Sequence, residues 1–272
     1  MKTINKFTFV IIVLISAIIT SCTNVKTDDL PDGASVSTVK DIDGNVYRTI
    51  KIGTQTWMVE NLKTTKYNNG NPITNLTDAS SWKTTSTGAW CNYENDIQTG
   101  DKYGKLYNWY AISTGYLAPK GWHIPTDAEW TTLENFLIIS GYNYDGTTSG
   151  NKIAKSLAAK TDWATSTGIG VIGNDLSKNN SSGFTALPGG WRDSKSDFGF
   201  LRDDPVSGII LNSGYWWCSS NSGSTDVIAR RLIYSDIVVN MYNTYSYPES
   251  KSLRKEIYLS KLFGLSVRCV KD

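Results

Sequence analysis

The sequence has few of the residues that most often carry catalytic or metal chemistry. Its 272 residues include one histidine, His123, and four cysteines. A serine or cysteine nucleophile needs a neighbouring base, and a zinc site needs a cluster of Cys, His or carboxylate ligands. We therefore expect His123 to have a buried, hydrogen-bonded structural role, and we expect no metal site, no cofactor and no enzymatic activity.

Strong charge of either sign is also missing. The chain has 27 Lys and Arg against 25 Asp and Glu, and removal of residues 1–21 would take away Lys2 and Lys6 and no acidic residue. A polyanion partner needs a concentrated basic face. We therefore expect no nucleic-acid partner.

Long apolar runs are limited to residues 7–19, which follow Lys2 and Lys6. This run is short for a membrane span. It leads into Ile-Thr-Ser-Cys22, which resembles a bacterial lipoprotein signal in which the cysteine is lipidated. An uncleaved anchor and an ordinary signal peptide are the alternatives, and the position of Cys22 directly after the run favours lipidation.

These features predict three segments and a location. Residues 1–21 are expected to be a lipoprotein signal peptide, residues 22–38 a flexible tether, and residues 39–272 one folded domain. The mature protein is expected to be extracytoplasmic and lipid-anchored to the bacterial outer membrane or cell surface.

The clearest helix signal begins at Thr126. Glu129 follows three residues later, the spacing of a capping box, and an apolar stripe comes next: Trp130, Leu133, Phe136 and Leu137. A shorter helical piece is expected near Trp109. Another is expected over residues 153–158, with Asn151 as its N-cap.

Short strands separated by turn residues make up the rest of the pattern. Residues 46–52 and 57–62 predict a β-hairpin, and later strand candidates span 184–187, 198–201, 215–218, 227–234, 237–242 and 265–270. No βαβ alternation is present. The fold class is therefore α+β, with a twisted antiparallel sheet, about two helices and long loops.

Acidic residues offer weak signals for chemistry. Asp41-x-Asp43-Gly44-Asn45 is similar to the start of a calcium loop, but the acidic ligand at position twelve is missing, so a plain turn is favoured. A glycosidase needs two carboxylates about 5–10 Å apart. The sequence offers the pairs Asp127/Glu129, Asp193/Asp197 and Asp203/Asp204, but nearly any domain offers such pairs. Solvated or helix-capping roles explain them better.

Aromatic residues are abundant, with ten Trp and 15 Tyr. Four residues expected at strand–loop junctions are candidates for ligand contact: Trp191, Arg192, Trp216 and Trp217. Core packing is nevertheless favoured, because Trp is highly buried on average. Adjacent residues of a strand point to opposite faces, so we expect at most one of Trp216 and Trp217 in the core. Tyr245 and Tyr247, in the Tyr- and Ser-rich stretch 242–258, are a second candidate surface.

Several segments together resemble one family. They are DGNVYRTIKIGTQTWMVENL (43–62), GKLYNWYA (104–111), PKGWHIPTDAEW (119–130), FTALPGGWR (184–192), GYWWCSS (214–220) and GLSVRCV (264–270). In this order they resemble the Fibrobacter succinogenes major paralogous domain family, over roughly residues 39–272. More distantly, PTDAEW and SVRCV are similar to formylglycine-generating enzymes, which implies a C-type-lectin-like fold.

The resemblance also bears on the cysteines and on activity. The family usually has Ser in place of Cys218, so the resemblance implies a disulfide between Cys91 and Cys269 and a free Cys218. Cys218 and Cys269 do not match the reactive pair of the formylglycine enzymes. We therefore expect a non-catalytic binding or adhesion module for a glycan or a surface protein. The alternatives are an enzyme of the formylglycine-generating or carbohydrate-active type, and a structural envelope protein.

Overall fold

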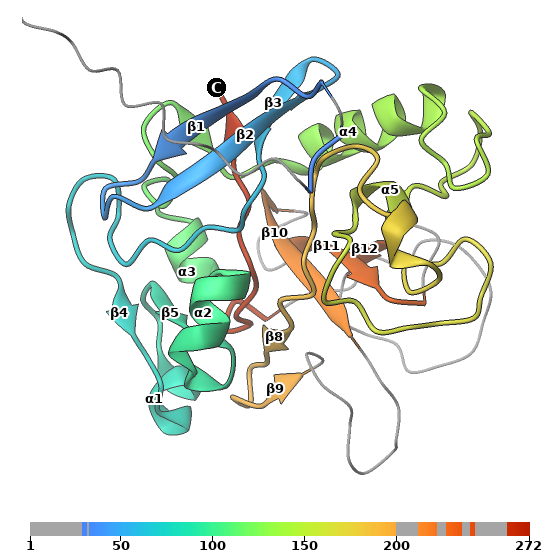
Figure 1. The fold of residues 1–272 in the computed structure, drawn as a ribbon. Coiled ribbons are helices and arrows are strands. Elements are labelled where there is room, and N and C mark those ends of the chain that lie inside the picture. Colours follow the sequence, from blue (N-terminus) through green and yellow to red (C-terminus); the bar gives the residue numbers. More distant parts are fainter. Residues whose placement is uncertain (1–28, 32, 200–211, 222–226, 236–239, 243–259) are drawn as a thin grey trace, which may run out of the picture.

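The computed structural model describes residues 29–31, 33–199, 212–221, 227–235, 240–242 and 260–272. Several small, mostly antiparallel sheets and a few helices are joined by long loops (Figure 1), so the α+β class is confirmed. Cys22, Tyr245 and Tyr247 lie outside the described residues.

The largest sheet has five strands, each antiparallel to its neighbours. In spatial order they are β1 (Val36–Lys40), β2 (Val46–Ile52), β3 (Gln55–Met58), β13 (Val270–Lys271) and β7 (Trp122–His123). The predicted hairpin is present as β2 and β3. Its turn requires glycine at Gly53, which has φ +62 and whose missing side chain leaves room for the Phe136 ring.

Part of the expected tether belongs to this sheet and to the core. β1 begins at Val36 and pairs with β2, and Leu30 is buried in the main apolar cluster. Asp29 also forms a bidentate ion pair with Arg48, at 2.5 and 3.0 Å. The domain boundary expected at residue 39 is therefore too late, because apolar burial and strand pairing hold the earlier residues in place.

A second sheet contains β10 (Ser213–Asn221), β11 (Val227–Ile233) and β12 (Asn240–Tyr242). Smaller sheets contain β4 (Thr74–Asn75), β5 (Ala89–Cys91) and β6 (Leu106–Tyr107), and β8 (Trp191–Arg192) with β9 (Phe198–Gly199). The strand expected over 184–187 is instead irregular chain with one isolated bridge at Ala186.

The described helices are α1 (Ala79–Thr84), α2 (Ile97–Tyr103), α3 (Trp109–Ile112), α4 (Asp127–Ile139) and α5 (Ala154–Leu157), with short 3-10 turns η1 (Tyr93–Asn95) and η2 (Leu176–Lys178). The capping box of Thr126 and Glu129 is present at the start of α4. α5 is one turn long and its N-cap is Ile153, so the expected cap at Asn151 is wrong. Within the described residues, no helix has both the length and the apolar character needed to cross a membrane.

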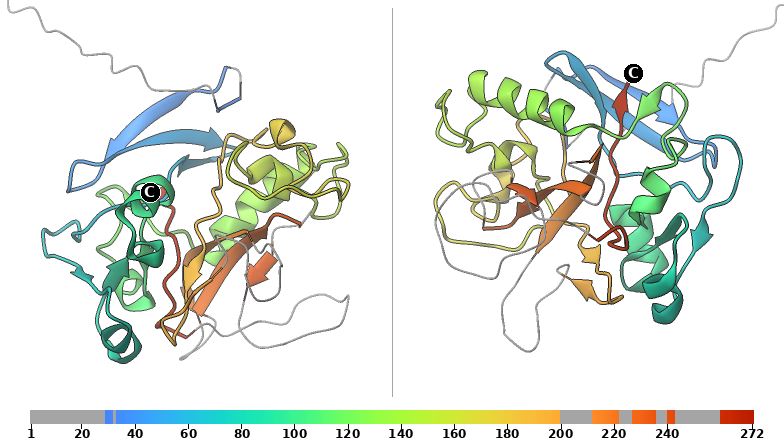
Figure 2. Two further views of the ribbon diagram at one scale, coloured as in Figure 1. Left: turned by 60° about the horizontal axis from the view of Figure 1, so that its bottom comes forward. Right: turned by 180° about the vertical axis from the view of Figure 1, so that it is seen from behind.

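Strand β10 is drawn in orange in Figure 2. It lies between two apolar clusters and is buried on both faces. Trp216 packs in the cluster that includes Trp57 and Trp130, whereas Trp217 packs in the cluster that includes Trp109. Their exposures are 1% and 0%. The expectation that at most one would be core is wrong, because the alternation places them on opposite faces and both faces are covered.

The described cysteines are buried free thiols, so the expected disulfide is not formed. Cys91 packs in a small cluster with Trp82 and Leu106, while Cys269 belongs to the cluster of Trp217. The two thiols are in separate parts of the core. Cys218 is a free thiol as expected, but Cys91 and Cys269 are free as well.

We predict that Trp216→Ala and Trp217→Ala each lower the free energy of unfolding by about 3–5 kcal/mol, because each removes a buried indole and leaves a cavity. Urea denaturation of the variants measures this loss. Ile169→Ala is the matched control, since Ile169 is 84% exposed and its truncation should change stability by less than about 0.5 kcal/mol. A Trp217→Ala variant of unchanged stability would contradict the two-faced burial of β10.

Candidate functional site

The residues expected to contact a ligand are mostly part of the scaffold. The Arg192 guanidinium lies between the rings of Trp82 and Phe198, at 4.5 and 4.9 Å, and Arg192 is 1% exposed. It also donates hydrogen bonds to the carbonyls of Leu76 and Thr77. These contacts place Arg192 in the interior rather than at a ligand surface.

The three candidate tryptophans differ in how far they are buried. Trp216 Nε1 donates to Asn61 Oδ1 at 2.8 Å, and Trp217 Nε1 donates to the Tyr107 carbonyl at 2.7 Å, so both indoles are satisfied inside. Trp191 is half-buried and packs on Phe263, with ring centroids 5.6 Å apart. Of the described candidates, Trp191 alone keeps partial access to solvent.

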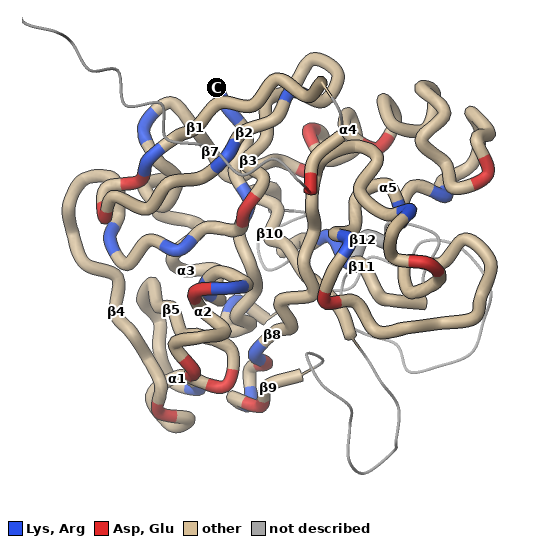
Figure 3. Tube along the Cα trace, viewed as in Figure 1, with Lys and Arg blue, Asp and Glu red and all other residues tan. Residues whose placement is uncertain are grey.

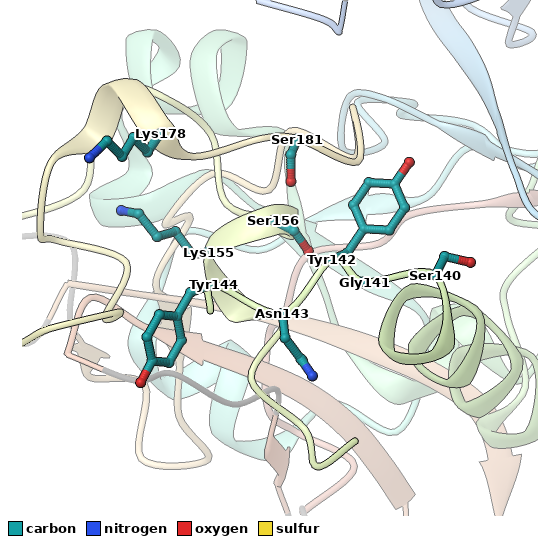
Figure 4. Close-up of a pocket in the computed structure, with 9 residues that line it drawn as sticks. All are labelled: Ser140, Gly141, Tyr142, Asn143, Tyr144, Lys155, Ser156, Lys178 and Ser181. Carbon is teal, nitrogen blue, oxygen red and sulfur yellow. The ribbon is translucent and has the colours of Figure 1, made fainter. Parts of the chain in front are cut away.

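A pocket of about 330 Å³ lies elsewhere, where α4 ends beside α5 (Figure 4). We call it the α4–α5 pocket. Its lining residues are Ser140, Gly141, Tyr142, Asn143, Tyr144, Lys155, Ser156, Lys178 and Ser181.

The end of helix α4 sets the position of the tyrosines. Gly141 has φ +77, the Gly141 N–H donates to the Ile138 carbonyl, and the Tyr142 N–H donates to the Leu137 carbonyl. This pair of bonds is a Schellman motif, which ends a helix sharply. Asn143 then uses its amide group to hold the loop 147–152. Tyr142 and Tyr144 are therefore presented from a fixed turn.

Several polar groups of this pocket have no internal partner. Within the described residues, the hydroxyls of Ser140, Tyr142, Tyr144 and Ser181 form no hydrogen bond to the protein. Tyr144 is 39% exposed, and its ring packs on Gly170, where a Cβ would come within 2.5 Å. The pocket thus combines accessible tyrosine rings with free hydroxyls.

Lys155 makes the wall of the pocket rigid. Its buried ammonium is surrounded by four oxygens: the carbonyls of Val171, Asn174 and Asp175, and Asn179 Oδ1. Burial lowers the pKa of Lys155, because its partners are neutral oxygens rather than a carboxylate. The side chain fixes the 171–179 loop beside the pocket.

A second pocket, of about 160 Å³, lies between the β2–β3 hairpin, α2 and residues 159–162. Several of its polar groups are engaged with other groups of the protein. Arg48 pairs with Asp29 and Glu60. Asn61 accepts hydrogen bonds from Trp216 and from Arg268, which is fully buried and whose pKa burial lowers to about 9. A ligand would have to displace these bonds, so the α4–α5 pocket is the better candidate.

His123 has partners that the sequence did not reveal. Its Nε2 lies 2.7 Å from Glu129, and its Nδ1 lies 2.6 Å from Asp272, which is 149 residues away in the chain. The side chain is 38% exposed, so the expected burial is wrong and the hydrogen-bonded role is confirmed. Partial burial disfavours the imidazolium, but the bonds to the two carboxylates outweigh it and raise the pKa of His123.

The other acidic candidates have structural roles where they are described. Asp41 accepts hydrogen bonds from Asp43, Asn45 and Tyr47, as a plain turn requires. Asp127 pairs at 2.7 Å with Arg230, which also pairs with Glu134 and ties α4 to β11. Asp203 and Asp204 lie outside the described part of the chain. In that part, no group of three or more His, Cys, Asp and Glu could hold a metal ion.

The chain belongs to the Fibrobacter succinogenes major domain family, whose model matches residues 50–271. This match confirms the resemblance carried by the motifs. No curated protein and no solved structure matches the chain.

We predict a pH-dependent contribution of His123 to stability. The pKa of His123 in the folded protein is raised above its usual value of about 6.5. Its contribution to the free energy of unfolding is therefore full below about pH 6.5, and it is lost as the pH rises through the folded pKa. The unfolding free energies of wild type and His123→Gln should differ by up to about 1 kcal/mol near pH 6, since the pair is partly exposed. That difference should shrink by about pH 9. A difference that grows with pH would contradict the assignment.

Proposed function

We propose that this member of the family is a lipid-anchored extracytoplasmic binding module with a C-type-lectin-like fold and no catalytic activity. Its ligand is a glycan or a surface protein, and we favour a glycan. The observation that carries the proposal is the α4–α5 pocket, where free hydroxyls and tyrosine rings line one cavity.

The chemistry of this pocket suits a sugar. A sugar ring presents hydroxyls at its edge and an apolar C–H face, and ligand sites combine aromatic walls with a few placed polar groups. Tyr142 and Tyr144 supply the rings, while Ser140 and Ser181 supply donors and acceptors with no internal bond to break. The pocket therefore offers both kinds of contact.

The distribution of charged residues supports a partner that is neutral or carries both signs of charge, rather than a polyanion. Figure 3 shows Lys and Arg interspersed with Asp and Glu over the described chain. Many of these charges pair locally, as Lys102 does with Asp162 and Lys152 with Asp145.

The thiol chemistry disfavours the alternative of a formylglycine-generating enzyme. Reactive cysteines need the thiolate at neutral pH. Burial raises the pKa of Cys91 and of Cys218 to about 12, and it raises the pKa of Cys269 as well. Thiols with such pKa values remain protonated and unreactive at neutral pH.

We predict that a glycan-array screen of the mature chain, run with calcium and with chelator, finds saturable binding that depends on the α4–α5 pocket. Tyr144→Ala should weaken binding about tenfold or more, because a stacking contact contributes about 0.5–1.5 kcal/mol and the hydroxyl adds to it. Ser181→Ala should weaken it less.

Tyr116→Ala is the matched control, since Tyr116 is an exposed tyrosine outside this pocket, and it should bind normally. Binding that survives Tyr144→Ala and is lost in Trp191→Ala would move the site to the Trp191–Phe263 surface. Absence of binding in both conditions would remove the glycan and leave a protein partner or a structural role.

A further inference from the structure

The chain is already docked onto the domain at Asp29, seven residues after Cys22. Leu30 is 6% exposed in the main core cluster, and Pro31 packs where Gly183 has no side chain. Arg48 holds the Asp29 carboxylate, and Asn180 Nδ2 donates to the Asp29 carbonyl at 2.5 Å. These contacts attach the segment to two separate parts of the fold.

This docking limits the distance between the domain and an anchor at Cys22. Seven residues reach at most about 25 Å in any conformation, whereas a tether extending to residue 39 would reach about 60 Å. A compact domain of this length has a diameter of about 45 Å. The reach is therefore about the radius of the domain, so the far half of the domain is out of reach and the docking point has to lie toward the membrane.

The α4–α5 pocket is next to this docking point. Asn180, which binds the Asp29 carbonyl, is followed directly by the pocket residue Ser181. Ser182 in turn donates its backbone N–H to the carbonyl of the pocket residue Ser156, at 3.1 Å. Helix α1, by contrast, lies at the opposite end of the molecule from α5 (Figures 1 and 2).

We propose that the docked segment holds the domain against the membrane with the α4–α5 pocket on the membrane-proximal side. The pocket then takes its ligand from the same membrane surface: a glycan carried by an envelope lipid or envelope protein, rather than one on another cell. This inference rests on the lipid anchoring proposed above.

Energy transfer to a membrane acceptor tests the orientation in the intact lipidated chain. Ser181→Cys and Lys83→Cys place one exposed thiol beside the pocket and one on α1. The described native cysteines are 0% exposed and Cys22 would carry acyl chains, so a thiol-reactive donor dye labels the new site. The protein is inserted into vesicles of phosphatidylcholine that contain an acceptor-labelled lipid.

The matched control lengthens the anchor without touching the described fold. An insertion of about 20 Gly and Ser residues between Val25 and Lys26 adds up to about 70 Å of reach. We expect stronger energy transfer from Ser181→Cys than from Lys83→Cys with the native spacing, and loss of that difference after the insertion.

The outcomes separate the two proposals. Failure of the protein to float with vesicles would overturn the lipid anchor and the orientation together. Flotation with equal transfer from the two positions, or with stronger transfer from Lys83→Cys, would overturn the orientation and leave the anchored binding module standing.

Discussion

The constraint on which this fold depends is the burial of strand β10 on both faces. Adjacent indoles at Trp216 and Trp217 serve two separate apolar clusters, and each N–H has to find an acceptor inside because an unpaired buried donor is costly. The indole N–H of Trp216 donates to Asn61 Oδ1, and that of Trp217 donates to the Tyr107 carbonyl. Asn61 also accepts from Arg268, so one amide connects the β2–β3 hairpin region, β10 and the C-terminal segment. The scaffold thereby uses these two aromatic side chains internally.

The sequence predicted those features of the fold that depend on residues close together in the chain. The capping box of Thr126 and Glu129 and the hairpin of β2 and β3 are fixed by neighbours within a few residues, and both are present. The two-sided burial of β10 was not predictable in this way, because alternation assigns opposite faces but not what covers them. The docking of Leu30 and the contact of His123 with Asp272 join positions far apart in the chain, and spacing carries no signal of such contacts. The Cys91–Cys269 bridge was inferred from a resemblance, and the two thiols occupy different clusters.

The candidate site was missed for a related reason. Serine, lysine and tyrosine in irregular loops have no distinctive spacing, and they meet only because the Schellman turn at Gly141 directs the chain toward α5 and the 178–181 segment. A signal was nevertheless present in Tyr142-Asn143-Tyr144, two aromatics around an asparagine directly after a helix-ending glycine. Trp216 and Trp217 were candidates for ligand contact from the sequence, and their burial removes both from such contact.

The most direct test of the α4–α5 pocket as the binding site is an amide chemical-shift titration of the isotope-labelled protein with the tightest glycan from the array. The account predicts that the perturbed amides cluster over residues 140–144, 155–156 and 178–181. Perturbations concentrated over residues 191–199 and 260–264 would contradict it and place the ligand on the Trp191–Phe263 surface.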